Sequence, residues 1–145
     1  MDFSLDINFV KKFKLRDLKL INVDHWLISL RPDQPTIGSL VLTLNRPCER
    51  LSMLTSEEGK SLAKAYTVIE DLLENTFKAQ KVNYLALMMF DEQVHFHVLP
   101  RYENPVLFNG KSYKDSGWPG PPSLEALELE DVEIHKLHNY MKEKV

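Results

Sequence analysis

The sequence predicts an α+β fold: an antiparallel sheet of about five strands packed against one long helix, with a second helix at the C-terminus. The first reason is the order of the segments, which runs from strands to one strong helix, back to strands, and ends in a helix. Strands grouped in this way favour an antiparallel sheet over alternating strand–helix–strand units. The second reason is the length of 145 residues, which is typical of one domain with its own core. We therefore expect a single domain over residues 1–145.

The first three strands of the predicted sheet precede the long helix. Residues 18–23 and 26–30 are short apolar runs of the kind found in half-buried strands. Two prolines disfavour helix in the residues before them, so residues 31–35 are expected to form a turn. Gly38 then precedes a third strand over residues 39–44, and the polar connection suits antiparallel pairing.

The long helix is predicted over residues 55–77. Thr55 and Glu58 form a capping box, in which each side chain accepts a hydrogen bond from a backbone N–H of the first turn. Apolar residues then recur every three or four positions and form one stripe that can pack on a sheet. This stripe consists of Leu62, Tyr66, Ile69, Leu73 and Phe77.

Two more strands, a loop and a helix complete the prediction. Residues 82–90 and 94–101 are expected to be neighbouring strands joined by a tight turn. The Pro- and Gly-rich stretch 104–122 is expected to be a loop. Residues 128–144 are expected to form the terminal helix. Its expected apolar contacts are Leu129, Val132, Ile134, Leu137 and Met141.

Composition excludes several classes of protein. The 18 Lys and Arg against 21 Asp and Glu give a net charge of −3, which does not favour nucleic acid or an anionic membrane as a partner. The single cysteine, Cys48, excludes an internal disulfide framework and a cysteine-rich zinc module. No apolar run approaches the roughly 18–20 residues that span a bilayer, and the first residues lack the pattern of a signal peptide. We therefore expect a cytoplasmic protein with no membrane partner.

The strand over residues 94–101 carries the most informative pattern. Because side chains alternate along a strand, Gln93, His95 and His97 share one face and apolar residues the other. The two histidines are roughly 6–7 Å apart along the backbone, so both imidazoles can reach one phosphate-sized group. A neutral imidazole is a nucleophile, and a second imidazole can donate a hydrogen bond to a phosphoryl oxygen or a leaving group. This covalent catalysis needs no metal or cofactor, and we expect neither.

Two other interpretations of the histidine pair stay open. The residues could be unreactive surface or groove histidines, which the spacing alone does not exclude. They could also be zinc ligands, because His-x-His is a common pair of ligands for that metal. The remaining ligands would come from His25, Cys48, Asp91 or Glu92, and no spacing singles these out.

The residues around the pair resemble the histidine triad (HIT) family. With φ for an apolar residue, its signature is His-φ-His-φ-His-φ-φ, and residues 95–99 match the last five positions. The resemblance covers about residues 16–122 and is closest to bacterial HIT hydrolases and to dinucleoside polyphosphate hydrolases of the fragile-histidine type. The Leu-Pro-Arg at 99–101 is similar to the latter, and the Trp-Pro at 118–119 is similar to a segment that closes the site in other members.

The sequence departs from the family pattern in three places. Gln93 stands where the first histidine of the triad belongs, so the chain is a Gln-x-His-x-His variant. Ser39 follows Gly38 where many relatives have histidine, and the short loop 90–92 lacks the phosphate loop of fragile-histidine-type enzymes. Gln93 can still donate and accept hydrogen bonds, so it can take the polar role of the missing histidine without its charge.

The resemblance implies a reaction at the α-phosphate of a small nucleotide, either a dinucleoside polyphosphate or a nucleoside phosphoramidate. His95 would attack the phosphorus to form a nucleotidyl-histidine, and His97 would hydrogen-bond the phosphoryl oxygens or the leaving group. Water or another acceptor would then cleave the intermediate, which makes the protein a hydrolase or a nucleotidyl transferase. The alternative is a non-catalytic nucleotide-binding or interaction module of the same fold. Relatives are commonly homodimers, which implies a homodimer here.

Five residues are candidates for contacting the substrate: Gln93, Arg101, Arg31, Asn45 and Trp118. All but Gln93 have a plainer alternative. Arg101 could be a solvated charge at a strand end, and Arg31 could be a turn residue before a proline. Asn45 could cap a turn with its side chain, and Trp118 could anchor its own loop.

Overall fold

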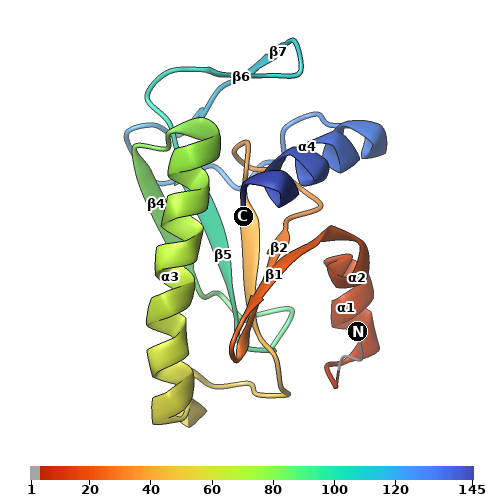
Figure 1. The fold of residues 1–145 in the computed structure, drawn as a ribbon, viewed down its shortest axis with the longest axis vertical. Coiled ribbons are helices and arrows are strands. Elements are labelled where there is room, and N and C mark those ends of the chain that lie inside the picture. The colour runs from red at the N-terminus through yellow and green to blue at the C-terminus, as the bar shows by residue number, and fades with distance from the viewer. Residues whose placement is uncertain (1–3) are drawn as a thin grey trace.

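The structure of the chain, a computed structural model, describes residues 4–145. Its centre is a five-stranded sheet in the order β1-β2-β3-β5-β4, in which all neighbouring strands are antiparallel. The strands are β1 (Lys19–Val23), β2 (Trp26–Leu30), β3 (Leu40–Leu44), β4 (Lys81–Leu85) and β5 (His95–Arg101). With the long helix α3 (Ser56–Phe77) and the C-terminal helix α4 (Asp131–Lys144), they confirm the predicted α+β fold (Figure 1).

One face of the sheet packs against α3 (Figure 1). The capping box predicted at the start of this helix is present: Thr55 Oγ1 accepts from the N–H of Glu58 at 3.1 Å, and Glu58 Oε1 accepts from the N–H of Thr55 at 2.9 Å. Apolar side chains of the helix and the sheet form one core cluster. Its fully buried members include Trp26, Ile28, Leu30, Leu42 and Ile69. This core holds the central strands in place from one side.

The opposite face of the sheet is covered in part by two short helices near the N-terminus, α1 (Ile7–Lys12) and α2 (Leu15–Leu18). The Asp6 carboxylate caps α1 by accepting hydrogen bonds from the N–H groups of Asn8 and Phe9. A second apolar cluster joins this segment to the sheet. It contains Leu5, Phe9, Val10, Phe13 and Leu15 together with Leu27 and Val41 of the strands. Helices of six and four residues are too short to leave a clear periodic signal, so the sequence does not predict them.

The strand register places both histidines of β5 on the face that α1 covers. Thr43 of β3 pairs with His95, and Val41 pairs with His97. Directly opposite residues of neighbouring strands project to the same face. Because Val41 belongs to the cluster beneath α1, the two imidazoles lie on that side of the sheet.

Two predicted boundaries around β4 and β5 differ from the structure. β4 ends at Leu85 rather than at residue 90. Residues 86–94 leave the sheet, and Met88 has a left-handed backbone with φ of 48°, which is incompatible with a continuing strand. β5 begins at His95, one residue later than predicted. The connection between the two strands is therefore longer than a tight turn.

The C-terminal third also differs in detail from the prediction. The expected loop 104–122 contains a small hairpin of β6 (Val106–Phe108) and β7 (Lys111–Tyr113). α4 begins at Asp131 rather than at residue 128, because Glu130 forms its N-cap. Val132, predicted to make an apolar contact, is 56% exposed in the first turn of the helix. The prediction for Val132 was wrong, whereas Ile134, Leu137 and Met141 are buried as predicted.

α4 covers the outer edge of β1. His138 Nε2 donates a hydrogen bond to the carbonyl of Lys19 at 2.7 Å, and Lys142 Nζ donates to the carbonyl of Leu20. These contacts satisfy carbonyl groups that an edge strand would otherwise present to solvent. Within residues 4–145, no helix is long and apolar enough to cross a membrane.

Candidate active site

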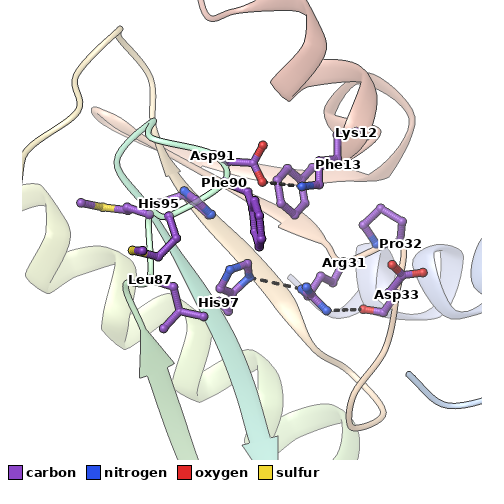
Figure 2. A pocket seen from close by; sticks show the side chains of 12 residues that line it. Lys12, Phe13, Arg31, Pro32, Asp33, Leu87, Phe90, Asp91, His95 and His97 are labelled. Atoms are coloured by element: carbon purple, nitrogen blue, oxygen red, sulfur yellow. Dashed lines mark hydrogen bonds and ion pairs between the residues drawn. The ribbon is translucent and has the colours of Figure 1, made fainter. Parts of the chain in front are cut away.

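His95 and His97 lie side by side on β5, and their ring centroids are 4.9 Å apart with the planes at 85°. β5 is hydrogen-bonded to β3 on one side and to β4 on the other. The two imidazoles are therefore carried by an interior strand of the sheet, which fixes their relative positions. Figure 2 shows both histidines beside one cavity.

His95 is held as a neutral imidazole with one free nitrogen. Its Nδ1 lies 2.5 Å from the carbonyl oxygen of Gln93. A carbonyl accepts hydrogen bonds, so Nδ1 carries the proton and Nε2 keeps its lone pair. The side chain is 1% exposed, and burial lowers its pKa. The rings of Phe9 and Phe13 contact the imidazole, with centroids 5.1 and 5.6 Å away.

His97 is held in the opposite tautomer. Arg31 Nε donates a hydrogen bond to His97 Nδ1 at 3.3 Å, so the ring proton is on Nε2. Burial, reinforced by the positive charge of Arg31, lowers the pKa of His97 to about 4. The site thus combines one imidazole nitrogen that can accept or attack with one imidazole N–H that can donate.

The cavity beside the two histidines has a volume of about 330 Å³. Lys12 of α1 and Arg31 supply two positive charges to its lining. The connection 87–90 contributes a largely apolar wall, in which the Phe90 ring is 98% exposed. A space of this size with apolar walls, cations and two imidazoles suits a small molecule that has both a phosphate and an apolar part.

An ion pair joins α1 to the connection between β4 and β5 at this cavity. Lys12 Nζ lies 2.6 Å from Asp91 Oδ2, as the dashed line in Figure 2 shows. The predicted site lacks Lys12, Phe13 and the 87–90 wall, because the sequence predicts neither α1 nor the end of β4. Aromatic and basic residues in the first 13 positions are the only trace of this part of the site in the sequence.

Of the five predicted substrate contacts, only Arg31 is among the residues that line this cavity. The Gln93 side chain is bound to backbone. Its Nε2 donates to the carbonyls of Leu44 and Arg46, at 3.0 and 2.8 Å, and its Oε1 accepts from the N–H of Cys48. Gln93 thereby ties the start of β5 to the turn that follows β3.

Arg101, Asn45 and Trp118 do not line the cavity. Arg101 is buried, and its Nε donates to Asp115 Oδ2 at 2.7 Å. Its Nη2 donates to the carbonyl of Gly120 at 2.9 Å, so it holds the segment that contains Trp118. Asn45 is half-buried at the end of β3. The structure therefore places Arg31 beside the two histidines, whereas Arg101, Asn45 and Trp118 lie outside the cavity.

The structure does not support the alternative in which the two histidines bind zinc, because the described residues do not provide a set of ligands. Among residues 4–145, no group of three or more His, Cys, Asp or Glu side chains is arranged to hold a metal ion. His25, one of the ligands considered, instead has its Nδ1 3.0 Å from Ser61 Oγ.

Stability is expected to fall on acidification from about pH 6.5 to about pH 4. In the unfolded chain both site histidines have a pKa of about 6.5, whereas in the fold the pKa of His95 is lowered and that of His97 is about 4. In this window the unfolded state binds more protons, so lower pH favours unfolding. Urea midpoints measured across the window test this. The fall of the urea midpoint with decreasing pH should be smaller in His97→Gln than in the wild type. It should be the same as in the wild type in His135→Gln, at an exposed histidine of α4. An equal fall in the wild type and His97→Gln would contradict the expectation.

Comparison with known proteins identifies the fold. No protein-family model matches the chain, and no curated protein matches it. A histidine triad protein of Sinorhizobium meliloti 1021 has a TM-score of 0.73 at 22% identity, covering 99% of this chain and 97% of that one. A histidine triad protein of Bradyrhizobium japonicum has a TM-score of 0.71 at 17% identity, covering 99% and 98%. A hypothetical histidine triad nucleotide-binding protein of Sulfolobus tokodaii strain 7 has a TM-score of 0.67 at 15% identity, covering 93% and 87%.

These similarities span nearly the whole chain at low sequence identity. They show that the chain has the fold of histidine triad proteins. At this level of identity they do not carry over a substrate or an activity.

Proposed function

We propose that the chain is a histidine triad enzyme that cleaves a small nucleotide at its α-phosphate, with His95 as the nucleophile. The observation that carries this proposal is the hydrogen bond from His95 Nδ1 to the carbonyl of Gln93. It commits the ring proton to Nδ1 and leaves the lone pair of Nε2 for attack, which is how an imidazole becomes a nucleophile at neutral pH. His95 and His97 line the same cavity.

The proposed reaction has two steps. His95 Nε2 attacks the α-phosphorus and displaces the other half of the substrate, which leaves a nucleotidyl-histidine. Water, or another acceptor, then attacks the same phosphorus and releases the nucleotide from His95. His97 Nε2–H and the charge of Arg31 stabilise the negative phosphoryl oxygens in both steps.

The variant residue at the first triad position is compatible with this mechanism. The group that orients His95 is the backbone carbonyl of Gln93, and every residue has one. The Gln93 amide is occupied in fixing the start of β5. A glutamine at this position therefore preserves the orientation of the nucleophile, and the loss of a histidine here does not argue against catalysis.

The test is to trap the intermediate. The purified chain is incubated with a panel of dinucleoside polyphosphates and nucleoside phosphoramidates, with a chelator present, then quenched and digested. Release of nucleoside monophosphate is expected, together with a peptide containing His95 that is heavier by one nucleotidyl group and loses it in acid. A nucleotidyl adduct on a residue other than His95, or product released equally fast by His95→Ala, would contradict the mechanism. Thermal stabilisation by AMP with no product would instead indicate the nucleotide-binding module.

The homodimer comes from the family resemblance and the cytoplasmic location from the composition of the sequence, and both remain predictions. The third open feature is whether the chain hydrolyses the nucleotidyl-histidine or transfers the nucleotidyl group to another acceptor. The last depends only on which acceptor reaches the nucleotidyl-histidine, so product analysis with and without added acceptors will separate the two.

A further inference from the structure

The hydrogen bond between Arg31 and His97 restricts the leaving group that the site can expel. Arg31 Nε lies 3.3 Å from His97 Nδ1. A guanidinium nitrogen donates hydrogen bonds and does not accept them, so His97 Nδ1 must hold a lone pair. While this bond is present, His97 is neutral. It can donate a hydrogen bond through Nε2, but it has no acidic proton to transfer.

His95 offers no acidic proton either. Its Nδ1–H is directed to the carbonyl of Gln93, and its Nε2 is the unprotonated nitrogen. The two imidazoles are the only groups in the lining whose ordinary pKa lies near neutrality, among the described residues. Neither of them can therefore protonate a leaving group.

The charged groups around His97 favour the same neutral state. Arg31 follows β2 and Lys12 belongs to α1, and both place positive charge near the ring. Asp91 opposes them from the 86–94 connection, but its carboxylate is paired with Lys12 at 2.6 Å. Asp33, the other acidic residue of the lining, lies beside Arg31. Both carboxyl groups of the lining thus lie next to a positively charged side chain.

Resting on the proposed function, we propose that the site cleaves phosphoanhydrides in preference to phosphoramidates, and that Arg31 is the positioning residue that holds His97 neutral. The bridging oxygen of an anhydride departs as part of a phosphate, which is stable as an anion. The nitrogen of a phosphoramidate departs as an amine only after it gains a proton. A site without an acid therefore favours the P–O–P bond over the P–N bond.

The proposed anhydride reaction balances without an acid. The lone pair of His95 Nε2 forms a bond to the α-phosphorus, and the bond from phosphorus to the bridging oxygen breaks with its electron pair on the departing phosphate. The ring is then cationic, with Nδ1–H still donating to the carbonyl of Gln93. Water forms the new P–O bond, the P–N bond returns its electron pair to Nε2, and the water proton passes to solvent.

A matched pair of substrates tests the preference in the full-length chain. Diadenosine triphosphate and adenosine 5′-phosphoramidate both yield AMP but differ in the bond that breaks. Because a positioned general acid contributes about 10²–10⁴-fold, kcat/KM near pH 7.5 is expected to be at least about 100-fold higher for the anhydride. A higher kcat/KM for the phosphoramidate would overturn the inference and leave the proposed function intact. AMP from neither substrate would overturn the proposed function and the inference with it.

The role of Arg31 is tested by Arg31→Met. Without the guanidinium, His97 Nδ1 is free to take a proton, so the acidic limb of the pH profile of kcat/KM should move to higher pH. The ratio of kcat/KM for the anhydride to kcat/KM for the phosphoramidate should fall. Arg50→Met, at an exposed arginine outside the cavity, is the matched control and should leave both unchanged. An unchanged profile in Arg31→Met would contradict the positioning role.

Nitrogen-15 NMR of the histidine rings gives a readout that is independent of turnover. At neutral pH, His97 is expected to be neutral with its proton on Nε2, and this signal should change in Arg31→Met. A protonated ring, or the Nδ1–H tautomer, would overturn the inference whatever the activity shows.

Discussion

Replacing His95 with alanine is expected to abolish the release of nucleoside monophosphate, with a fall in kcat on the order of 10³-fold or more, as for other catalytic nucleophiles. Every step of the proposed reaction passes through the bond between His95 Nε2 and phosphorus. Lys12, Arg31 and His97 remain in the variant, so binding of AMP should survive. The measurement is AMP release in the presence of a chelator, alongside AMP binding by calorimetry.

Two controls separate loss of chemistry from loss of structure. His95→Gln keeps an N–H that can donate to the carbonyl of Gln93, so it should unfold at close to the wild-type temperature and still lack activity. His135→Ala, at an exposed histidine of α4, should be fully active. Appreciable turnover by folded His95→Ala would show that another group attacks the phosphorus, and the proposed mechanism would be abandoned.

The parts of the fold that the sequence predicts are those with a long or regular signal. α3 begins at the capping box of Thr55 and Glu58 and ends at Phe77, as the 3.6-residue period indicates. The turn before β3 contains Gly38, whose φ of 89° is one that other residues rarely adopt, so a glycine there indicates the turn. The alternation along β5 places the two histidines on one face, since that rule depends only on strand geometry.

The parts that the sequence does not predict depend on contacts between distant segments. Lys12 and Phe13 reach the histidines because α1 is held over the sheet by Leu27 and Val41, and no local pattern encodes that packing. Arg31 is the opposite case. Its position before a proline suggests a turn residue, yet the register of β2, β3 and β5 brings it within hydrogen-bond distance of His97.

Arg101 shows why a charged residue near a motif is a weak indication of substrate binding. From the sequence it is a cation close to the histidines, and a phosphate partner is a natural expectation. In the structure its side chain is 5% exposed and is paired with Asp115, which is 1% exposed. Asp115 also accepts a hydrogen bond from the N–H of Tyr102 at 3.1 Å. The charge of Arg101 is thus already neutralised inside the protein.

Asp115→Ala is therefore expected to destabilise the fold by about 3–5 kcal/mol, because it leaves the Arg101 guanidinium buried without its counter-charge. Urea unfolding should show a lower midpoint with an unchanged slope. Replacing both partners, as Arg101→Met with Asp115→Leu, should recover much of the loss, since apolar pairs often substitute for buried ion pairs. Glu57→Ala is the control, because the Glu57–Lys60 pair is exposed and should contribute less than about 1 kcal/mol.

The double variant also decides between the two roles of Arg101. If its charge serves only the buried pair, the Arg101→Met, Asp115→Leu protein will fold and turn over substrate with a KM close to that of the wild type. If Arg101 instead binds the phosphate of the substrate, KM will rise even where stability has recovered. The structure favours the first outcome, because Nε, Nη1 and Nη2 of Arg101 all donate to acceptors of the protein itself.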